Sequence, residues 1–311
     1  MNISIIGLGY WGKHYVRIVN SSEHKLTAIC DLNEETFEKY KHIKTNFYTN
    51  YITMFKKEQL DGVIIVTIAK FHLKIIKDAL KYDLKVFVEK PYTLSLKDCN
   101  ELESILDKRD KLMVGHTYLF NSKIQFIREY LKEEMKDVKS ISFTWTCFGP
   151  IRKDTNPIFD LSVHPISILL YLFPNKKITN INTVRTKTGN SYFINFILGD
   201  IIVQFNISWA CPGKTRKIII SDEKNKLIFD DVSNKEPVRV LKLKNPNINV
   251  KNNSPQTLIH SDGNIYIPQI DNSEPLTDQF NEWVKYCNDG VECISNHKFS
   301  KKVIELCEIL Q

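Results

Sequence analysis

Hydrophobic and polar residues change their spacing about a third of the way along the chain. Up to about residue 120, short apolar runs alternate with stretches whose apolar residues recur at helical spacing. Apolar runs without alternation are typical of strands buried on both faces, hence of a parallel sheet covered by helices. We expect strands at Ile3–Ile6, Leu26–Cys30, Gly62–Val66, Val86–Val88 and Leu112–Val114, and helical segments at Glu34–Tyr40 and Phe71–Leu80.

Beyond about residue 136 the pattern predicts a mostly antiparallel sheet, because strand-like runs follow one another across short turns such as Leu198-Gly199-Asp200. A helix over Asp160–Phe173 is expected to lie against this sheet, and a second helical region covers Leu276–Gln311. The polar, Asn-rich stretch from about Asn245 to Gly263 is interpreted as a loop. The expected strands are Lys139–Phe148, Ile178–Thr186, Ser191–Leu198, Ile201–Ser208, Arg216–Ser221 and Lys226–Phe229.

The length of 311 residues suits two domains, because single cores usually stop growing near about 250–300 residues. We predict an α/β chain with a parallel-sheet domain over residues 1–120. An α+β domain with a large, mostly antiparallel sheet should cover residues 121–311, with its last helix free to pack back on the first domain.

The composition bears on the cellular location of the protein and on the partners it can have. No apolar run is long enough to span a membrane, and because the chain enters its first strand at once, we expect no signal peptide. The 7 cysteines form no C-x-x-C pair, so we expect reduced thiols, a cytoplasmic location and no metal. The net charge of +7 comes mainly from lysines interleaved with Asp and Glu, which is typical of a solvated surface, and we expect no nucleic-acid partner.

The first expected strand leads into Gly7-Leu8-Gly9-Tyr10-Trp11-Gly12, ahead of a helical segment. In that context G-x-G-x-x-G predicts a Rossmann-type dinucleotide site, with the pyrophosphate at the helix N-terminus. Asp31 ends the second strand, where a carboxylate binds the adenosine ribose hydroxyls and repels a 2′-phosphate. We therefore expect NAD in preference to NADP. The alternative is a glycine-rich structural turn with an incidental aspartate.

Further motifs follow in a specific order. Val86-Phe87-Val88-Glu89-Lys90-Pro91 resembles the Glu-Lys-Pro motif of the glucose–fructose oxidoreductase / inositol dehydrogenase (Gfo/Idh/MocA) family, and Phe159–His164 resembles its D-x-x-x-H catalytic helix. The resemblance runs along nearly the whole chain and is greatest to the nucleotide-sugar 3-dehydrogenases. Its other blocks are Thr67–His72, with Ile68 in place of the usual proline, Val114–Asn121, Ser208-Trp209 through Arg216, and Glu274-Pro275-Leu276.

The resemblance implies roles for individual residues. Lys90, Asp160 and His164 are the expected catalytic residues, and no residue is expected to bind a metal. The expected cofactor-binding residues are Gly7, Gly9, Tyr10, Trp11, Gly12, Asp31, Thr67, His72, Glu89 and Lys90. The expected substrate-binding residues are Lys90, Tyr118, Asn121, Arg152, Asn156 and His164, and Asp154 lies in the same loop as Arg152 and Asn156.

Chemistry supports the catalytic roles, and each has a plainer alternative. A lysine beside a nicotinamide can stabilise charge that develops on the reacting oxygen, whereas a surface position is the commonest fate of lysine. Asp160 and His164 share a face of a regular helix, where the carboxylate can orient the proton-accepting imidazole. Because Pro165 favours a helix start, Asp160 could instead be an N-cap. Ser167 replaces an acid found in many relatives, which leaves substrate contacts open.

His72 and His116 both follow strand-like runs, where ligands gather in open α/β sheets. The resemblance places both near the cofactor, although the default interpretation of each is a packing histidine. Neither is included in the catalytic set.

These observations predict hydride transfer between NAD and a sugar hydroxyl carbon, with C3 of a UDP-N-acetylglucosamine-type sugar as the specific expectation. The resemblance also implies a homodimer or homotetramer built on the second-domain sheet. Two alternatives of related chemistry remain, namely a free-sugar or inositol dehydrogenase and a keto-sugar-nucleotide reductase. An alternative of another class is a non-catalytic dinucleotide-sensing regulator, against which the joint presence of Lys90, Asp160 and His164 argues.

Overall fold

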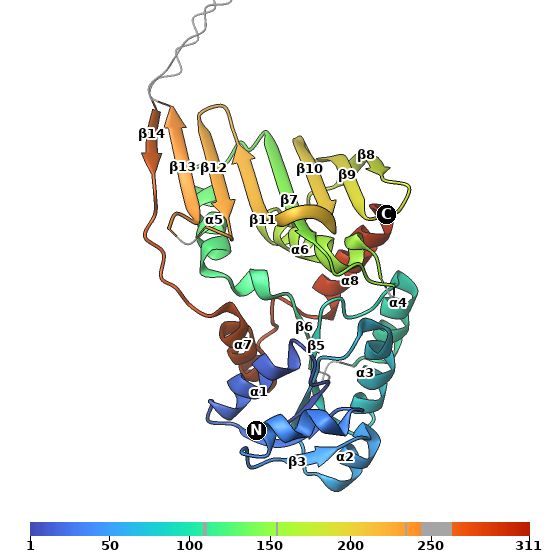
Figure 1. Cartoon of the computed structure of the whole chain (residues 1–311). Coiled ribbons are helices and arrows are strands. Elements are labelled where there is room, and N and C mark those ends of the chain that lie inside the picture. The colour runs from blue at the N-terminus through green and yellow to red at the C-terminus, as the bar shows by residue number, and fades with distance from the viewer. Residues whose placement is uncertain (108–110, 154, 234, 244–262) are drawn as a thin grey trace, which may run out of the picture. The chain divides into compact units, whose positions relative to one another are not determined.

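The computed structural model describes residues 1–107, 111–153, 155–233, 235–243 and 263–311. Contacts divide the chain into two compact units. The first unit comprises Met1–Asn121 and Ser273–Ile309, and the second comprises Ser122–Asn272 and Leu310–Gln311. The segment after residue 272 therefore belongs mainly to the same unit as the N-terminal third of the chain (Figure 1).

The first unit is built on a six-stranded, wholly parallel sheet in the order β3-β2-β1-β4-β5-β6. The predicted parallel sheet is thereby confirmed, since each expected run forms a strand. The short strand β3 was not expected, because its three residues stand alone between polar neighbours. The strands are β1 (Asn2–Ile6), β2 (Lys25–Cys30), β3 (Asn46–Tyr48), β4 (Gly62–Ile65), β5 (Lys85–Glu89) and β6 (Leu112–Gly115).

Helices flank this sheet where apolar residues recur at helical spacing. For example, α3 buries Ile75, Ile76 and Ala79, whereas the predicted helix over Glu34–Tyr40 is a 3₁₀ helix, η1. The single helical region expected over Leu276–Gln311 is two helices, α7 and α8. The helices of this unit are α1 (Gly12–Asn20), η1 (Glu34–Tyr40), α2 (Tyr51–Lys57), η2 (Ala69–Phe71), α3 (His72–Leu80), α4 (Leu96–Ile105), η3 (Thr117–Phe120), α7 (Pro275–Asp289) and α8 (His297–Ile309).

The edge strand β6 is covered by the segment that connects α7 and α8. The Val114 N–H donates to the Ser295 carbonyl at 2.9 Å, and the Ser295 hydroxyl donates back to the Val114 carbonyl. Met113 and Asn296 form an antiparallel bridge. Because a sheet edge exposes unpaired backbone groups, this cover both satisfies β6 and fixes α8 beside its carboxyl end.

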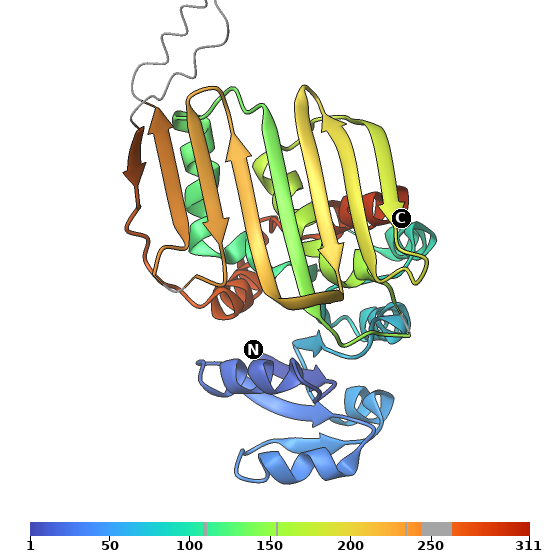
Figure 2. The ribbon, with the colours of Figure 1, turned by 45° about the horizontal axis from the view of Figure 1, so that its top comes forward.

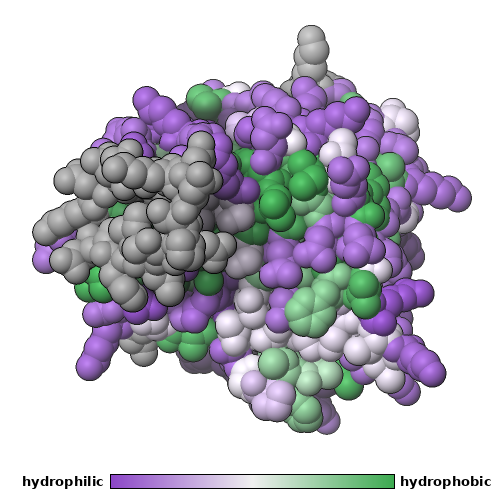
Figure 3. Space-filling view, turned by 90° about the horizontal axis from the view of Figure 1, so that it is seen from above, coloured by the Kyte–Doolittle hydropathy of each residue, from purple (hydrophilic) through white to green (hydrophobic). Residues whose placement is uncertain are grey.

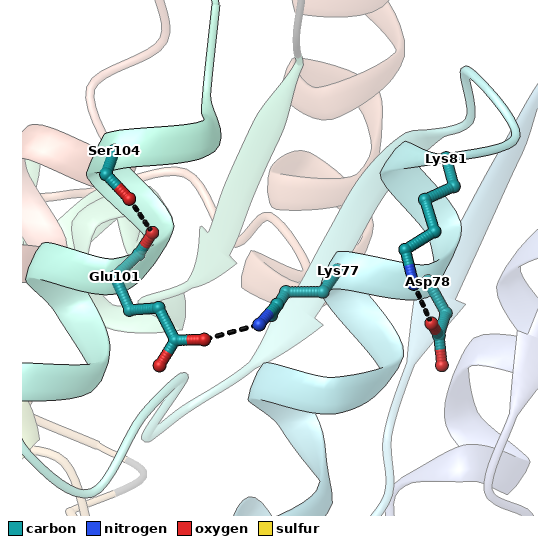
Figure 4. A network of polar contacts seen from close by, with 5 residues as sticks. All are labelled: Lys77, Asp78, Lys81, Glu101 and Ser104. Atoms are coloured by element: carbon teal, nitrogen blue, oxygen red, sulfur yellow. Dashed lines mark hydrogen bonds and ion pairs between the residues drawn. The ribbon is translucent and has the colours of Figure 1, made fainter.

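Polar contacts on the surface of this unit tie neighbouring helices together (Figure 4). Lys77 of α3 forms an ion pair with Glu101 of α4, and Lys81 pairs with Asp78 within α3 at 2.8 Å. Exposed pairs of this kind contribute about 0–1 kcal/mol each. This network therefore adds little stability and connects α3 to α4 at the surface of the unit.

The second unit is an eight-stranded mixed sheet in the order β14-β13-β12-β11-β7-β10-β9-β8 (Figure 2). Only the pair β7–β10 is parallel, so the prediction of a mostly antiparallel sheet is confirmed. Strands β13 and β14 were not predicted. The strands are β7 (Ser140–Phe148), β8 (Ile178–Arg185), β9 (Ser191–Leu198), β10 (Ile201–Ser208), β11 (Ala210–Ser221), β12 (Asn225–Asp230), β13 (Val238–Leu243) and β14 (Gly263–Tyr266).

Helices cover one face of this sheet, which gives the strands their alternation of buried and exposed residues. The helices are α5 (Ser122–Glu133), the π-helical turn η4 (Ile158–Ser162) and α6 (Val163–Leu172). The core of the unit includes Phe143, Phe196 and Phe205, whose rings meet edge to face at 5.0 and 5.4 Å. Apart from Gly263, the loop predicted from about Asn245 to Gly263 lies outside the described residues.

None of the described helices combines the length and apolar character needed to cross a membrane. Within the same residues, no three side chains among His, Cys, Asp and Glu gather in a way that could hold a metal ion.

Candidate functional site

The turn between β1 and α1 has the geometry that a dinucleotide-binding loop requires. Gly7 has a φ of +97°, and a Cβ there would lie 2.7 Å from the Val66 carbonyl oxygen. A Cβ on Gly12 would lie 2.1 Å from the Gly7 carbonyl oxygen, so only glycine permits this close packing of helix and strand. A Cβ on Gly9 would meet nothing within 4 Å. The middle glycine thus borders open space, where a pyrophosphate can approach the backbone.

Helix α1 begins directly after this turn. Trp11 occupies the N-cap position without a side-chain cap, and the first turn carries no acidic residue. The N-terminal N–H groups and the positive end of the helix dipole therefore suit a bound phosphate. Tyr10 and Trp11 are exposed and pack edge to face, with the Lys13 ammonium 4.8 Å from the Tyr10 ring centre.

Asp31 follows β2 and lies beside the glycine turn. The Leu8 N–H donates to Asp31 Oδ2 at 2.6 Å, and the Asn33 N–H donates to Oδ1 at 2.9 Å. The carboxylate is thus anchored at the carboxyl ends of β1 and β2, where a dinucleotide presents its adenosine ribose. With the open space at Gly9, this arrangement fits an adenine dinucleotide. Gly7, Gly9, Gly12 and Asp31 are therefore brought together.

Thr67 and Lys90 follow β4 and β5, and His72 connects the two loops. The His72 ring is buried, with Nε2 2.9 Å from the Thr67 carbonyl oxygen and Nδ1 3.0 Å from the Pro91 carbonyl oxygen. Burial lowers the pKa of His72 to about 4. The neutral ring can donate to only one of these carbonyl oxygens at a time, and it lies between the two loops that carry them.

Glu89 lies in the interior of the first unit. Its carboxylate accepts hydrogen bonds from the Tyr15 hydroxyl and from the Lys90 N–H, and the Gln279 amide donates to the Tyr15 oxygen at 2.8 Å. Burial raises the pKa values of Glu89 and Tyr15. The network fixes the end of β5, after which Lys90 is half-buried and the Lys90–Pro91 peptide bond is cis.

Tyr118 lies half-buried in η3, and Asn121 is buried just after it.

In the second unit, Trp209 and Arg152 lie against the Asp160 carboxylate. Trp209 Nε1 donates to Asp160 Oδ2 at 3.0 Å, and Arg152 Nη1 lies 3.7 Å from Oδ1. Asp160 is in the π-helical turn η4, and half-buried His164 is in α6. The regular helix predicted over both residues is therefore wrong in detail, because the turn before Val163 is wider than an α-helical turn.

Asn156 caps the start of this segment. Its side-chain oxygen accepts from the backbone N–H groups of Ile158 and Phe159, at 2.9 and 3.1 Å. This cap sets the direction in which η4 begins. Asp154 lies outside the described residues.

Sequence reasoning missed Tyr15, Gln279 and Trp209 as parts of these networks. Tyr15 and Gln279 are 264 positions apart, and Trp209 reaches Asp160 across 49 positions, so no local pattern could pair them. The only available signal was for Trp209, which lies in a block that resembles the family.

The parallel sheet, the glycine turn and Asp31 together define a dinucleotide-binding protein of the Rossmann class. Residues 1–116 match the model of the oxidoreductase family with an NAD-binding Rossmann fold, GFO_IDH_MocA. Residues 1–116 therefore form a Gfo/Idh/MocA family domain, which confirms the predicted family resemblance over that part of the chain.

The curated relatives include a hydratase and an inositol dehydrogenase. A 2,7-anhydro-N-acetylneuraminate hydratase of Mediterraneibacter gnavus is 26% identical over 133 residues, which is 42% of this chain and 35% of the relative. An inositol 2-dehydrogenase of Salmonella typhimurium is 28% identical over 138 residues, covering 42% of this chain and 38% of the relative. These matches span well under two thirds of the relatives they match.

A third relative is similar in both sequence and structure. The UDP-N-acetylglucosamine 3-dehydrogenase of Acidithiobacillus ferrooxidans is 23% identical over 181 residues, covering 55% of this chain and 54% of the relative. Its solved structure superposes with a TM-score of 0.85 over 100% of this chain and 96% of the other, at 15% identity. At this identity the superposition supports the fold alone.

Proposed function

We propose that this protein is an NAD-dependent oxidoreductase that transfers hydride between the nicotinamide and a sugar hydroxyl carbon. We propose C3 of a UDP-sugar of the UDP-N-acetylglucosamine type as that carbon. The observation that carries the proposal is the glycine turn with Asp31 anchored beside it, in a domain of an NAD-binding oxidoreductase family.

NAD is proposed in preference to NADP because of Asp31. Its carboxylate is anchored by the Leu8 N–H beside the space that Gly9 leaves open. A carboxylate there accepts hydrogen bonds from ribose hydroxyls and repels a 2′-phosphate. Thr67, Tyr10, Trp11 and Lys90 are proposed to complete the cofactor contacts, and Glu89 and His72 to hold the loops that carry them.

The residues of each unit are proposed to have distinct tasks in the reaction. When bound, NAD supplies the carbon that accepts hydride. Lys90 orients the substrate hydroxyl and stabilises negative charge on its oxygen. His164 takes the hydroxyl proton, which is the task to which an imidazole is suited near neutral pH.

Asp160 is proposed to support His164 from the preceding turn. Because Trp209 and Arg152 hold the Asp160 carboxylate, its position is fixed before substrate binds. Arg152 also supplies a guanidinium in the loop ahead of η4, which suits a phosphate or carboxylate of the substrate. Asn156, Tyr118 and Asn121 are the further proposed substrate contacts.

The choice of a nucleotide sugar is supported by the sequence similarity to a UDP-N-acetylglucosamine 3-dehydrogenase. The inositol 2-dehydrogenase relative favours a second candidate, oxidation of a free polyol. The two differ in whether the substrate carries a diphosphate, so a comparison of UDP-sugars with free inositols and sugars separates them.

The catalytic assignment is tested with Lys90→Met and His164→Asn. Each variant should lower kcat by at least about 100-fold, because a polarising or proton-transferring group typically contributes that much. NAD affinity, measured by calorimetry, should change less than threefold in His164→Asn. Turnover that is unchanged in both variants would overturn the assignment, and loss of NAD binding in His164→Asn would indicate a structural role.

A further inference from the structure

His116 is buried at the carboxyl end of β6 with both ring nitrogens unsatisfied. The residue is 2% exposed, and neither Nδ1 nor Nε2 has a hydrogen-bond partner. A buried polar atom without a partner is unfavourable, and such atoms are usually hydrogen-bonded in folded proteins. Among the described residues, His116 is the histidine for which this holds at both nitrogens. A bound ligand would explain the two unpartnered ring nitrogens, and the position of His116 supports this explanation.

The register of the sheet places His116 next to Lys90. Glu89 of β5 pairs with Gly115 of β6, so the residues that follow them, Lys90 and His116, leave neighbouring parallel strands side by side. Neighbouring strands lie about 4.8 Å apart. On its other side, the His116 ring meets Phe299 of α8 with ring centres 5.7 Å apart. The ring is thus wedged between an apolar wall and the strand end that carries Lys90.

The order of the strands indicates which half of a bound dinucleotide would lie near His116. Asp31 and the glycine turn follow β2 and β1, and the chain then crosses to β4, β5 and β6 on the other side of β1. In such sheets the dinucleotide crosses the carboxyl ends at the switch point, with adenosine on the β2 side and the second nucleoside on the other. His116 is on the side of the second nucleoside.

We infer that His116 is a cofactor-binding residue that hydrogen-bonds the carboxamide of the nicotinamide. The inference rests on the proposed function. A neutral imidazole offers one N–H donor and one acceptor nitrogen, and a carboxamide offers an oxygen acceptor and an NH₂ donor, so the two groups are complementary. Burial, together with the positive charge of Lys90, lowers the pKa of His116 to about 3, which keeps the ring neutral.

The test compares NAD⁺ with ADP-ribose, which has the same adenosine and diphosphate but no nicotinamide. We expect His116→Phe to weaken NAD⁺ binding about tenfold, as the loss of a buried hydrogen bond predicts, and to leave ADP-ribose binding unchanged. His116→Gln, which retains a donor and an acceptor, should bind NAD⁺ more tightly than His116→Phe. Calorimetry on the full chain measures all of these affinities.

Thr27→Val is the matched control, because it removes another buried, unpartnered polar atom of the first unit, at β2. It should bind both ligands as the wild type does. Equal NAD⁺ affinity in His116→Phe and the wild type would overturn the inference, as would equal weakening of NAD⁺ and ADP-ribose. If the wild type bound neither ligand, the proposed function would fail as well.

A second measurement uses the wild type in case His116→Phe does not fold. In protein with ¹⁵N-labelled histidine, the His116 ring signals, assigned by their absence in His116→Gln, should shift with NAD⁺ and stay unchanged with ADP-ribose. Signals that respond equally to both ligands, or to neither, would overturn the inference.

Discussion

At the residue scale, the site depends on side chains that never need to touch a substrate. Glu89 accepts from Tyr15 and from the Lys90 N–H, and the buried His72 ring lies between the Thr67 and Pro91 carbonyl oxygens. Lys90 therefore lies between Glu89, which Tyr15 of α1 contacts, and Pro91, whose carbonyl oxygen lies beside His72 of α3. The Glu-Lys-Pro motif combines one structural carboxylate with one lysine that is proposed to act on the substrate.

Glu89 gives the first prediction, on how stability depends on pH. Burial raises the pKa of Glu89 in the folded state above its unfolded value. The folded state then holds the proton where the unfolded state has lost it, so rising pH favours unfolding across the interval between the two pKa values. Relative to Glu89→Gln, the wild type should lose free energy of unfolding as pH rises from about 4.5. Urea unfolding at several pH values measures this, and a difference that is independent of pH would contradict it.

At the element scale, the glycine turn shows that one motif serves both stability and binding. A Cβ at Gly12 would collide with the Gly7 carbonyl, whereas a Cβ at Gly9 would enter open space. Gly12→Ala should therefore destabilise the fold by at least about 2 kcal/mol. Gly9→Ala should keep the wild-type stability and weaken NAD⁺ binding at least about tenfold. Thermal unfolding and calorimetry separate the two effects, and equal NAD⁺ affinity in Gly9→Ala and the wild type would contradict the assignment of the turn.

Elements with a clear hydrophobic pattern could be predicted from the sequence, whereas contacts between distant elements could not. The apolar runs of β1, β2, β4, β5 and β6 predicted the parallel sheet, and the glycine spacing predicted the turn. Strand β3 has three residues, too few for a period to show. The π-helical turn at Asp160 depends on the Asn156 cap and on packing against β7 and β10, which no local pattern reports.

At the scale of the whole molecule, the eight-stranded sheet presents an apolar open face. Val184 is 59% exposed and lies in register with Phe193, which is 50% exposed, and Ile202 is 59% exposed on the next strand. Leu241 and Ile265 form a second exposed pair, on β13 and β14. On the side of the molecule seen in Figure 3, hydrophobic side chains form patches among polar ones. Exposed patches of this kind mark interaction sites.

We propose that a second copy of this chain covers this face, as the expected homodimer or homotetramer requires. Phe193→Lys combined with Ile202→Lys should convert the oligomer to a monomer, because each lysine would have to be buried without a partner. Light scattering after gel filtration measures the mass. Exposed Lys176→Glu on the same unit serves as the control and should leave the mass unchanged. A monomeric wild type, or an oligomer that survives both lysines, would contradict the proposal.

We propose that this chain oxidises a nucleotide sugar with NAD. The most direct measurement is the absorbance of NADH after purified protein is mixed with NAD⁺ and each member of a panel of UDP-sugars, dTDP-sugars, free sugars and inositols. We expect NADH with a UDP-N-acetylglucosamine-type sugar and none with free sugars or inositols. NADH formed only with inositol or a free sugar would contradict the nucleotide-sugar assignment. NAD⁺ binding without reduction by any member of the panel would contradict the proposed oxidation itself.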